Sequence, residues 1–180
     1  MMTFKILNKS FAQMTSSTNN SLFAPDELLA LARHHIDNNR LDLALEKLKL
    51  VLAGNAPEPE AIAMTARLYA QLGLPRRAQE LFQHYLVLHP DAPTEQFQLA
   101  MAYFNDGQAE QAQALWDTIL ERDPVHPPAL YFSALHQARL GKAQDARRHL
   151  DVLLQSAASS NLYAERGREL LQSLDTTAQQ

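Results

Sequence analysis

The chain has 180 residues, which is enough for one domain or one repeat array but too short for two enzyme-sized domains. Hydrophobic residues make up 46% and charged residues 20%, as in folded, water-soluble chains, and the net charge of −4 lacks the basic excess that draws proteins to nucleic acids or anionic lipids. We therefore expect no nucleic-acid partner and no direct insertion into a membrane. The absence of cysteine excludes disulfides, thiolate nucleophiles and cysteine-ligated metals.

Residues 1–24 are expected to form an N-terminal arm that includes a polar linker at 15–21 (TSSTNNS). Apolar side chains recur in the arm at helical spacing, although Thr3–Leu7 alone also fits the alternation of a strand. These apolar residues are Phe4, Leu7, Phe11 and Met14. We expect them to cap the open edge of the first unit, at residues 25–58. The alternatives are that they occupy a binding groove of the same or a neighbouring molecule, so that residues 1–14 could mediate self-association, or that the segment is a disordered tail. The run is too short for a secretory signal, and we expect a cytoplasmic protein.

A period of 34 residues organises the chain from residue 25 to 160. Gly73, Gly107 and Gly141 are 34 residues apart, and one further step back is Asn39, the residue type that best replaces glycine at the left-handed end of a helix. Two sets of alanines and one set of large apolar residues keep this spacing. The sets are Ala32, Ala66, Ala100 and Ala134; Ala44, Ala78, Ala112 and Ala146; and Leu48, Phe82, Trp116 and Leu150. Because small residues let helix backbones approach and the large residue fills the space beside them, we expect Trp116 to be buried.

These registers resemble the tetratricopeptide repeat (TPR) family, whose unit of 34 residues is a helix, a turn and a second helix. The units are 25–58, 59–92, 93–126 and 127–160. The resemblance implies an all-α helical-repeat solenoid, and we expect no β-strand between residues 25 and 174. Pro75 and Pro93 fall where helices should begin, since the first helical position needs no N–H donor. Residues 161–174 are expected to form a C-terminal capping helix for the array, followed by a tail at 175–180 with nothing to bury.

No pattern in the sequence indicates an enzyme, a cofactor or a metal site. Neighbouring His34 and His35 would point about 100° apart on a helix, whereas a helical zinc pair needs i, i+4 spacing and a third ligand. His35 also takes the place of Tyr69 and Tyr103 in the next units, which favours a packing role. No serine or carboxylate pair has a recognisable base beside it, and no glycine-rich phosphate-binding motif occurs. We therefore expect a non-catalytic protein without a cofactor.

The resemblance also implies that the first helix of each unit lines a concave groove in which family members bind partners. Carried over to this sequence, the groove has two arginines in the first two units and apolar side chains in the last two. The candidate partner-binding residues are Arg33, Arg67, Phe97, Met101, Phe104, Tyr131 and Leu135. The aromatic residues fit ordinary inter-helix core equally well when taken singly. As a group the apolar residues fit an interaction site, and Arg33 and Arg67 supply a charged end. The expected partner segment, helical or extended, is therefore apolar at one end and acidic at the other.

These observations favour a protein-interaction scaffold that holds a peptide or helix segment of another protein. The alternative is a chaperone that shields an apolar segment of a secreted or membrane-associated client, because bacterial secretion chaperones with TPR units have a similar size and a similar groove. A scaffold should bind a folded partner reversibly, whereas a chaperone should keep an insoluble client in solution.

Overall fold

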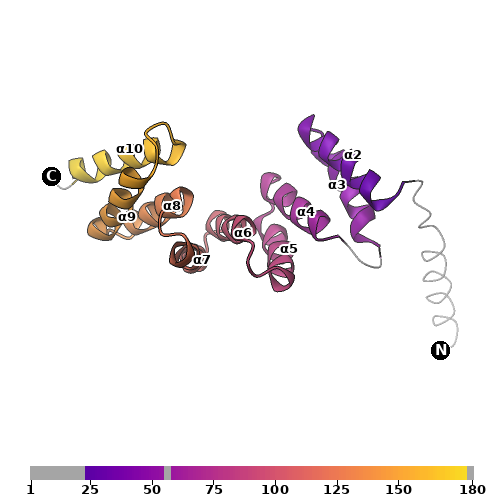
Figure 1. Ribbon diagram of the computed structural model, residues 1–180, viewed down its shortest axis with the longest axis horizontal. Coiled ribbons are helices and arrows are strands. Elements are labelled where there is room, and N and C mark those ends of the chain that lie inside the picture. The colour runs from indigo at the N-terminus through magenta and orange to yellow at the C-terminus, as the bar shows by residue number, and fades with distance from the viewer. Residues whose placement is uncertain (1–22, 55–57, 178–180) are drawn as a thin grey trace, which may run out of the picture. The chain divides into compact units, whose positions relative to one another are not determined.

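The structure is a computed structural model that describes residues 23–54 and 58–177. The predicted arm at residues 1–14 lies outside this part of the chain. The described residues form helices and no strand, which confirms the predicted all-α repeat fold (Figure 1). The helices are α2 (Pro25–Asp37), α3 (Leu41–Leu52), α4 (Pro59–Gln71), α5 (Pro75–Leu88), α6 (Pro93–Asn105), α7 (Ala109–Arg122), α8 (Pro127–Arg139), α9 (Ala143–Ser156) and α10 (Leu162–Thr177).

The chain divides into two compact units, one up to Thr65 and one from Ala66 onward. In the first unit, α2 packs on α3. In the second unit, each helix from α5 to α10 packs on the next along the chain, and α10 also contacts α8 (Figure 1). Consecutive helices therefore bury one another's apolar faces, as a helical repeat requires.

The turns inside the repeats have the backbone conformation that the sequence predicts. Gly73, Gly107 and Gly141 have φ angles of 71°, 79° and 72°, and Asn39 has a φ of 54°. In this left-handed conformation the chain leaves the first helix and still satisfies the helix's last carbonyl groups: the Arg40 N–H donates to the His35 carbonyl at 2.8 Å. Glycine carries no Cβ penalty here, and asparagine is the side chain that tolerates the conformation best.

The recurring apolar residues form the core of the repeats. Every member of the two alanine sets and of the large apolar set is fully buried, with a relative exposure of 0%. In the third repeat, Trp116 packs against Ala100, Ala112 and Ile119, and against Ala129 at the start of the fourth. The predicted burial of Trp116 is thus confirmed.

Helix ends follow the sequence signals, with one difference at the C-terminus. Pro25, Pro75, Pro93 and Pro127 each open a helix. At the start of α10, the Asn161 side-chain oxygen accepts a hydrogen bond from the Tyr163 N–H at 2.9 Å. This helix runs to Thr177, beyond its expected end at residue 174. The Asp175 carboxylate, expected in the tail, accepts a hydrogen bond from Arg147 of α9 at 2.8 Å, and this contact holds the last turn of α10 against α9.

Candidate functional site

The two predicted arginines are each paired with a glutamate of this chain. In the first unit, Arg33 Nε donates to Glu60 Oε1 at 3.2 Å, and both side chains are about half exposed. In the second unit, Arg67 Nη1 donates to Glu95 Oε1 at 3.0 Å, and the Glu95 side chain is only 12% exposed. Both guanidinium groups therefore already have a carboxylate partner, which the sequence did not indicate.

The three predicted apolar residues of α6 lie together. Phe97, Met101 and Phe104 are spaced by four and three residues, so they share one face of the helix. All three are half-buried and pack against the core cluster that contains Trp116. Part of each side chain packs in the core and part stays exposed. The interpretation as inter-helix core and the interpretation as a partner-binding surface therefore both apply to these three residues.

The predicted residues of α8, Tyr131 and Leu135, are one helical turn apart and half-buried. Tyr131 packs on the next core cluster along the chain, which contains Leu150 and Leu153. Its ring also meets the Tyr163 ring of α10, with the ring centroids 5.9 Å apart. Tyr131 therefore belongs to a different core cluster from that of the α6 residues.

A residue that the sequence analysis missed, Phe132, joins the two groups. Its ring centroid lies 6.0 Å from that of Phe97, 5.9 Å from that of Phe104 and 5.2 Å from that of Tyr131. It also stacks on the Trp116 ring at 5.7 Å. We refer to the half-buried residues Phe97, Met101, Phe104, Tyr131, Phe132 and Leu135 as the α6/α8 surface.

Phe132 could not be found by comparing repeats, because its place in the earlier units is taken by Ala30, Met64 and Gln98. The available signal was local. Tyr131 and Phe132 are adjacent aromatic residues in α8, and the preceding first helix, α6, contains three aromatic residues.

His126 forms the start of α8 and contacts the α6/α8 surface. It is the N-cap residue, and its Nδ1 accepts a hydrogen bond from the Ala129 N–H at 3.3 Å. Its ring centroid lies 5.8 Å from that of Phe97. Burial lowers the pKa of His126 below the usual 6.5, and the nearby Asp123 carboxylate opposes this shift only in part. The neutral imidazole is therefore the form that the fold favours.

Acid should weaken the start of α8 through His126. Protonation removes the acceptor at Nδ1 and puts a cation at the positive end of the helix dipole. Because the folded-state pKa is lowered, this contribution to stability is present above about pH 6.5 and is lost as the pH falls below that value. As the pH falls, the free energy of unfolding of the wild type should decrease by up to about 1 kcal/mol more than that of His126→Asn. The asparagine amide oxygen caps the helix without titrating. Chemical denaturation over a pH series measures this difference.

The control is His84→Asn, which removes an exposed histidine of α5. This variant should keep the wild-type pH dependence. The same pH dependence in wild type and His126→Asn would contradict the prediction.

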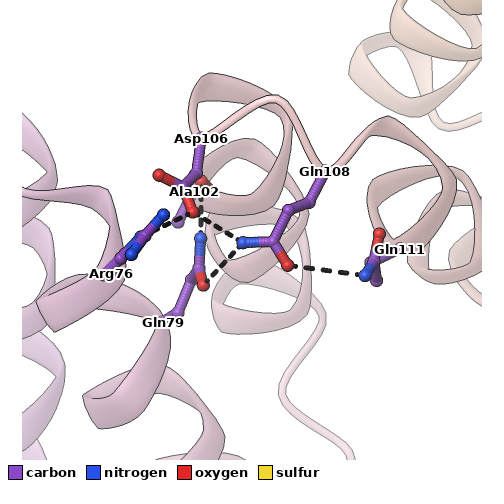
Figure 2. Close-up of polar contacts among 6 residues, drawn as sticks. All are labelled: Arg76, Gln79, Ala102, Asp106, Gln108 and Gln111. Atoms are coloured by element: carbon purple, nitrogen blue, oxygen red, sulfur yellow. Dashed lines mark hydrogen bonds and ion pairs between the residues drawn. The ribbon is translucent and has the colours of Figure 1, made fainter.

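A polar network links α5 to α6 and to the start of α7 (Figure 2). Buried Gln79 donates to the Ala102 carbonyl at 3.1 Å, and Gln108 donates to Gln79 at 3.3 Å and to Asp106 at 2.6 Å. The Gln108 amide holds the pKa of Asp106 below its usual value, and Arg76, whose Nε lies 3.3 Å from the same carboxylate, acts in the same direction. The network has no nucleophile with a base beside it, so we interpret it as a structural link between the second and third repeats.

Three further features of the described residues bear on binding or catalysis. No group of three or more His, Asp or Glu side chains there is arranged to hold a metal ion. None of the described helices is both long enough and apolar enough to cross a membrane. One hollow of about 330 Å³ is lined by His126, Asp91, Asp123, Gln96 and their neighbours, and none of the predicted partner-binding residues lines it.

Comparisons with known proteins agree with the helical-repeat fold. A tetratricopeptide repeat family model matches residues 97–161. Cellulose synthase operon protein C of Pseudomonas fluorescens (strain SBW25) is 32% identical over 130 residues, and the match covers 68% of this chain. The chain spans only about a tenth of the length of that curated relative.

Two solved structures share the fold. A tetratricopeptide repeat protein from Parabacteroides merdae superposes with a TM-score of 0.73 at 22% identity, covering 85% of this chain and 60% of the other. YrrB, described as a TPR protein with an unusual peptide-binding site, gives a TM-score of 0.72 at 18% identity, covering 81% of this chain and 75% of the other.

The helix pairs of the described residues define an all-α helical-repeat protein. The chain has the 34-residue period of the tetratricopeptide repeat, and the family model matches its third and fourth units. The chain therefore belongs to the tetratricopeptide repeat family.

Proposed function

We propose that this protein is a non-catalytic scaffold that binds a peptide or helix segment of a partner protein on the α6/α8 surface. One observation carries the proposal: Phe132 joins half-buried aromatic side chains of two first helices, α6 and α8. Half-buried Met101 lies on the same face of α6 as these aromatic residues. An apolar surface of this kind that stays partly exposed in a folded protein usually marks an interaction site.

The chemistry of the surface suits an amphipathic segment. Phe97, Phe104 and Phe132 are fixed by their contacts with one another and with Trp116, so a partner would meet rings that lose little freedom on binding. Met101 between them adapts to an irregular partner. An amphipathic helix or an extended segment can place apolar side chains over such rings.

The comparisons give support at the level of the family. YrrB has a peptide-binding site, and its likeness to this chain lies in the fold alone. The cellulose synthase operon protein is far longer, so we propose only that the shared repeats bind proteins in both. The proposal includes a bacterial source, in line with the bacterial origin of this relative, and a cytoplasmic location. Self-association through residues 1–14 stays a prediction.

The chaperone alternative differs from the scaffold in what the α6/α8 surface does for its partner. As a scaffold, the protein should bind a partner that is already folded and soluble. As a chaperone, it should raise the soluble yield of a co-expressed client that aggregates alone. The two functions use the same residues, so the state of the partner decides between them.

We expect Phe97→Asp and Met101→Asp each to reduce capture of the specific partner about tenfold or more, because a carboxylate would replace an apolar contact within the surface. The measurement is affinity purification from the native host, with quantitative mass spectrometry of the proteins that co-purify. Val87→Asp is the matched control, since Val87 on α5 is 79% exposed and lies outside the α6/α8 surface.

Circular dichroism must first show that each variant is folded, because Phe97 and Met101 also pack on the core. Proteins captured equally by the wild type and all three variants would count against the α6/α8 surface as the binding site.

A further inference from the structure

Arg139 places a positive charge beside the α6/α8 surface. It is the last residue of α8 and is exposed. Its guanidinium carbon lies 5.0 Å from the centroid of the Phe104 ring, a cation–π geometry. The Phe104 ring in turn contacts those of Trp116 and Phe132, at 5.5 Å and 5.9 Å. The cation thus stands over a ring that is itself held in place.

Arg139 differs from the two arginines that the sequence singled out. Arg33 and Arg67 each have a glutamate partner, whereas no carboxylate within the described part of the chain forms an ion pair with Arg139. A partner carboxylate at Arg67 would have to displace Glu95, which is mostly buried. At Arg139 no such exchange is needed.

A guanidinium above a ring can still bind a carboxylate. Its N–H donors lie in the plane of the group and point outward from its edges, so an edge that does not face the ring can donate two parallel hydrogen bonds to a carboxylate. The ring also restricts the long arginine side chain before a partner arrives, which lowers the entropy lost on binding.

We propose that Arg139 makes the α6/α8 surface selective for a partner segment that carries an aspartate or glutamate side chain next to its apolar residues. This inference rests on the proposed function. Tyr131 lies two helical turns before Arg139 on α8, so the acidic residue binds at the C-terminal end of α8 and the apolar residues lie over Phe104, Phe132 and Tyr131. A side-chain carboxylate, unlike a chain terminus, lets the segment continue past Arg139 in either direction.

The test uses an array of short synthetic peptides with blocked termini and apolar residues at helical spacing. Each peptide is made with one glutamate at a varied position and again with glutamine in its place. Fluorescence anisotropy then gives the affinity of the best binder. We expect the glutamate peptide to bind the wild type about threefold to fivefold more tightly than its glutamine twin, and less so at high salt.

Two variants assign this difference to Arg139. Arg139→Gln should abolish the preference for glutamate. Arg77→Gln should keep it, because exposed Arg77 of α5 makes the same kind of contact with another ring, that of Tyr69 at 5.5 Å, outside the α6/α8 surface. A glutamine peptide with a free C-terminal carboxyl group should bind no better than its blocked form.

Equal binding of the glutamate and glutamine peptides to the wild type would overturn the role of Arg139 and leave the proposed function intact. A preference that survives in Arg139→Gln, or that needs a free C-terminus, would overturn it too. If no peptide in either series binds the folded wild type, the proposed function fails, and the inference fails with it.

Discussion

Replacing Trp116 with alanine should lower the free energy of unfolding by about 3–5 kcal/mol, the largest effect that we expect from one substitution in this chain. The side chain is fully buried, packs against the alanines of α6 and α7, and stacks on Phe132 of the next repeat. Its removal leaves a cavity where two repeats meet. Urea denaturation followed by circular dichroism measures the change.

Two further substitutions make this test specific. Trp116→Phe keeps an aromatic ring on Phe132 and should cost clearly less than Trp116→Ala. Val87→Ala, at a position that is 79% exposed, should change stability by less than about 0.5 kcal/mol. A denaturation midpoint for Trp116→Ala within the range of Val87→Ala would mean that Trp116 does not join the repeats.

Replacing Gly167 with leucine should push α10 away from α9, at a cost of roughly 1–3 kcal/mol for overpacking. A Cβ atom at position 167 would lie 3.0 Å from the Leu153 Cδ2 and 3.4 Å from the Leu150 Cδ2, and both leucines are fully buried. A larger side chain has no space without moving one of the two helices. Hydrogen exchange should show faster exchange in α10 than in the wild type.

Gly167→Ala is the matched control for this prediction. Alanine gains about 1 kcal/mol in helix propensity over glycine, which offsets the tight contact of its single methyl group, so its stability should stay near that of the wild type. Unchanged exchange in α10 of the leucine variant would show that the contact between α9 and α10 does not depend on the small residue.

The fold was predictable because a repeat imposes the same demands on each unit. The glycines at 34-residue spacing predicted the left-handed turns, and Asn39 fitted the same rule despite its different side chain. The alanine sets predicted the buried positions because only small residues let the helices approach. The end of α10 was harder to place, since Arg147 holds Asp175 from another helix, and helical periodicity carries no information about that contact.

The candidate surface was predictable only in part, because its important contacts join different repeats. Phe97 and Phe104 were found from their position on a first helix. Phe132 was missed, since it faces the preceding unit at a position where the other repeats have alanine, methionine or glutamine and no aromatic residue. The partners of Arg33 and Arg67 depend on how one first helix lies against the next, and a pattern within one helix cannot show this. The role of the α6/α8 surface in binding stays a prediction.

The position of Trp116 gives the protein an internal optical reporter. It is the single tryptophan of the chain, and its ring lies against Phe104 and Phe132 of the α6/α8 surface. Its emission therefore comes from one place in the fold, directly beneath the side chains that a partner would cover. A segment that shifts those rings would change the tryptophan emission spectrum without any added label, so candidate ligands can be titrated against the unmodified protein.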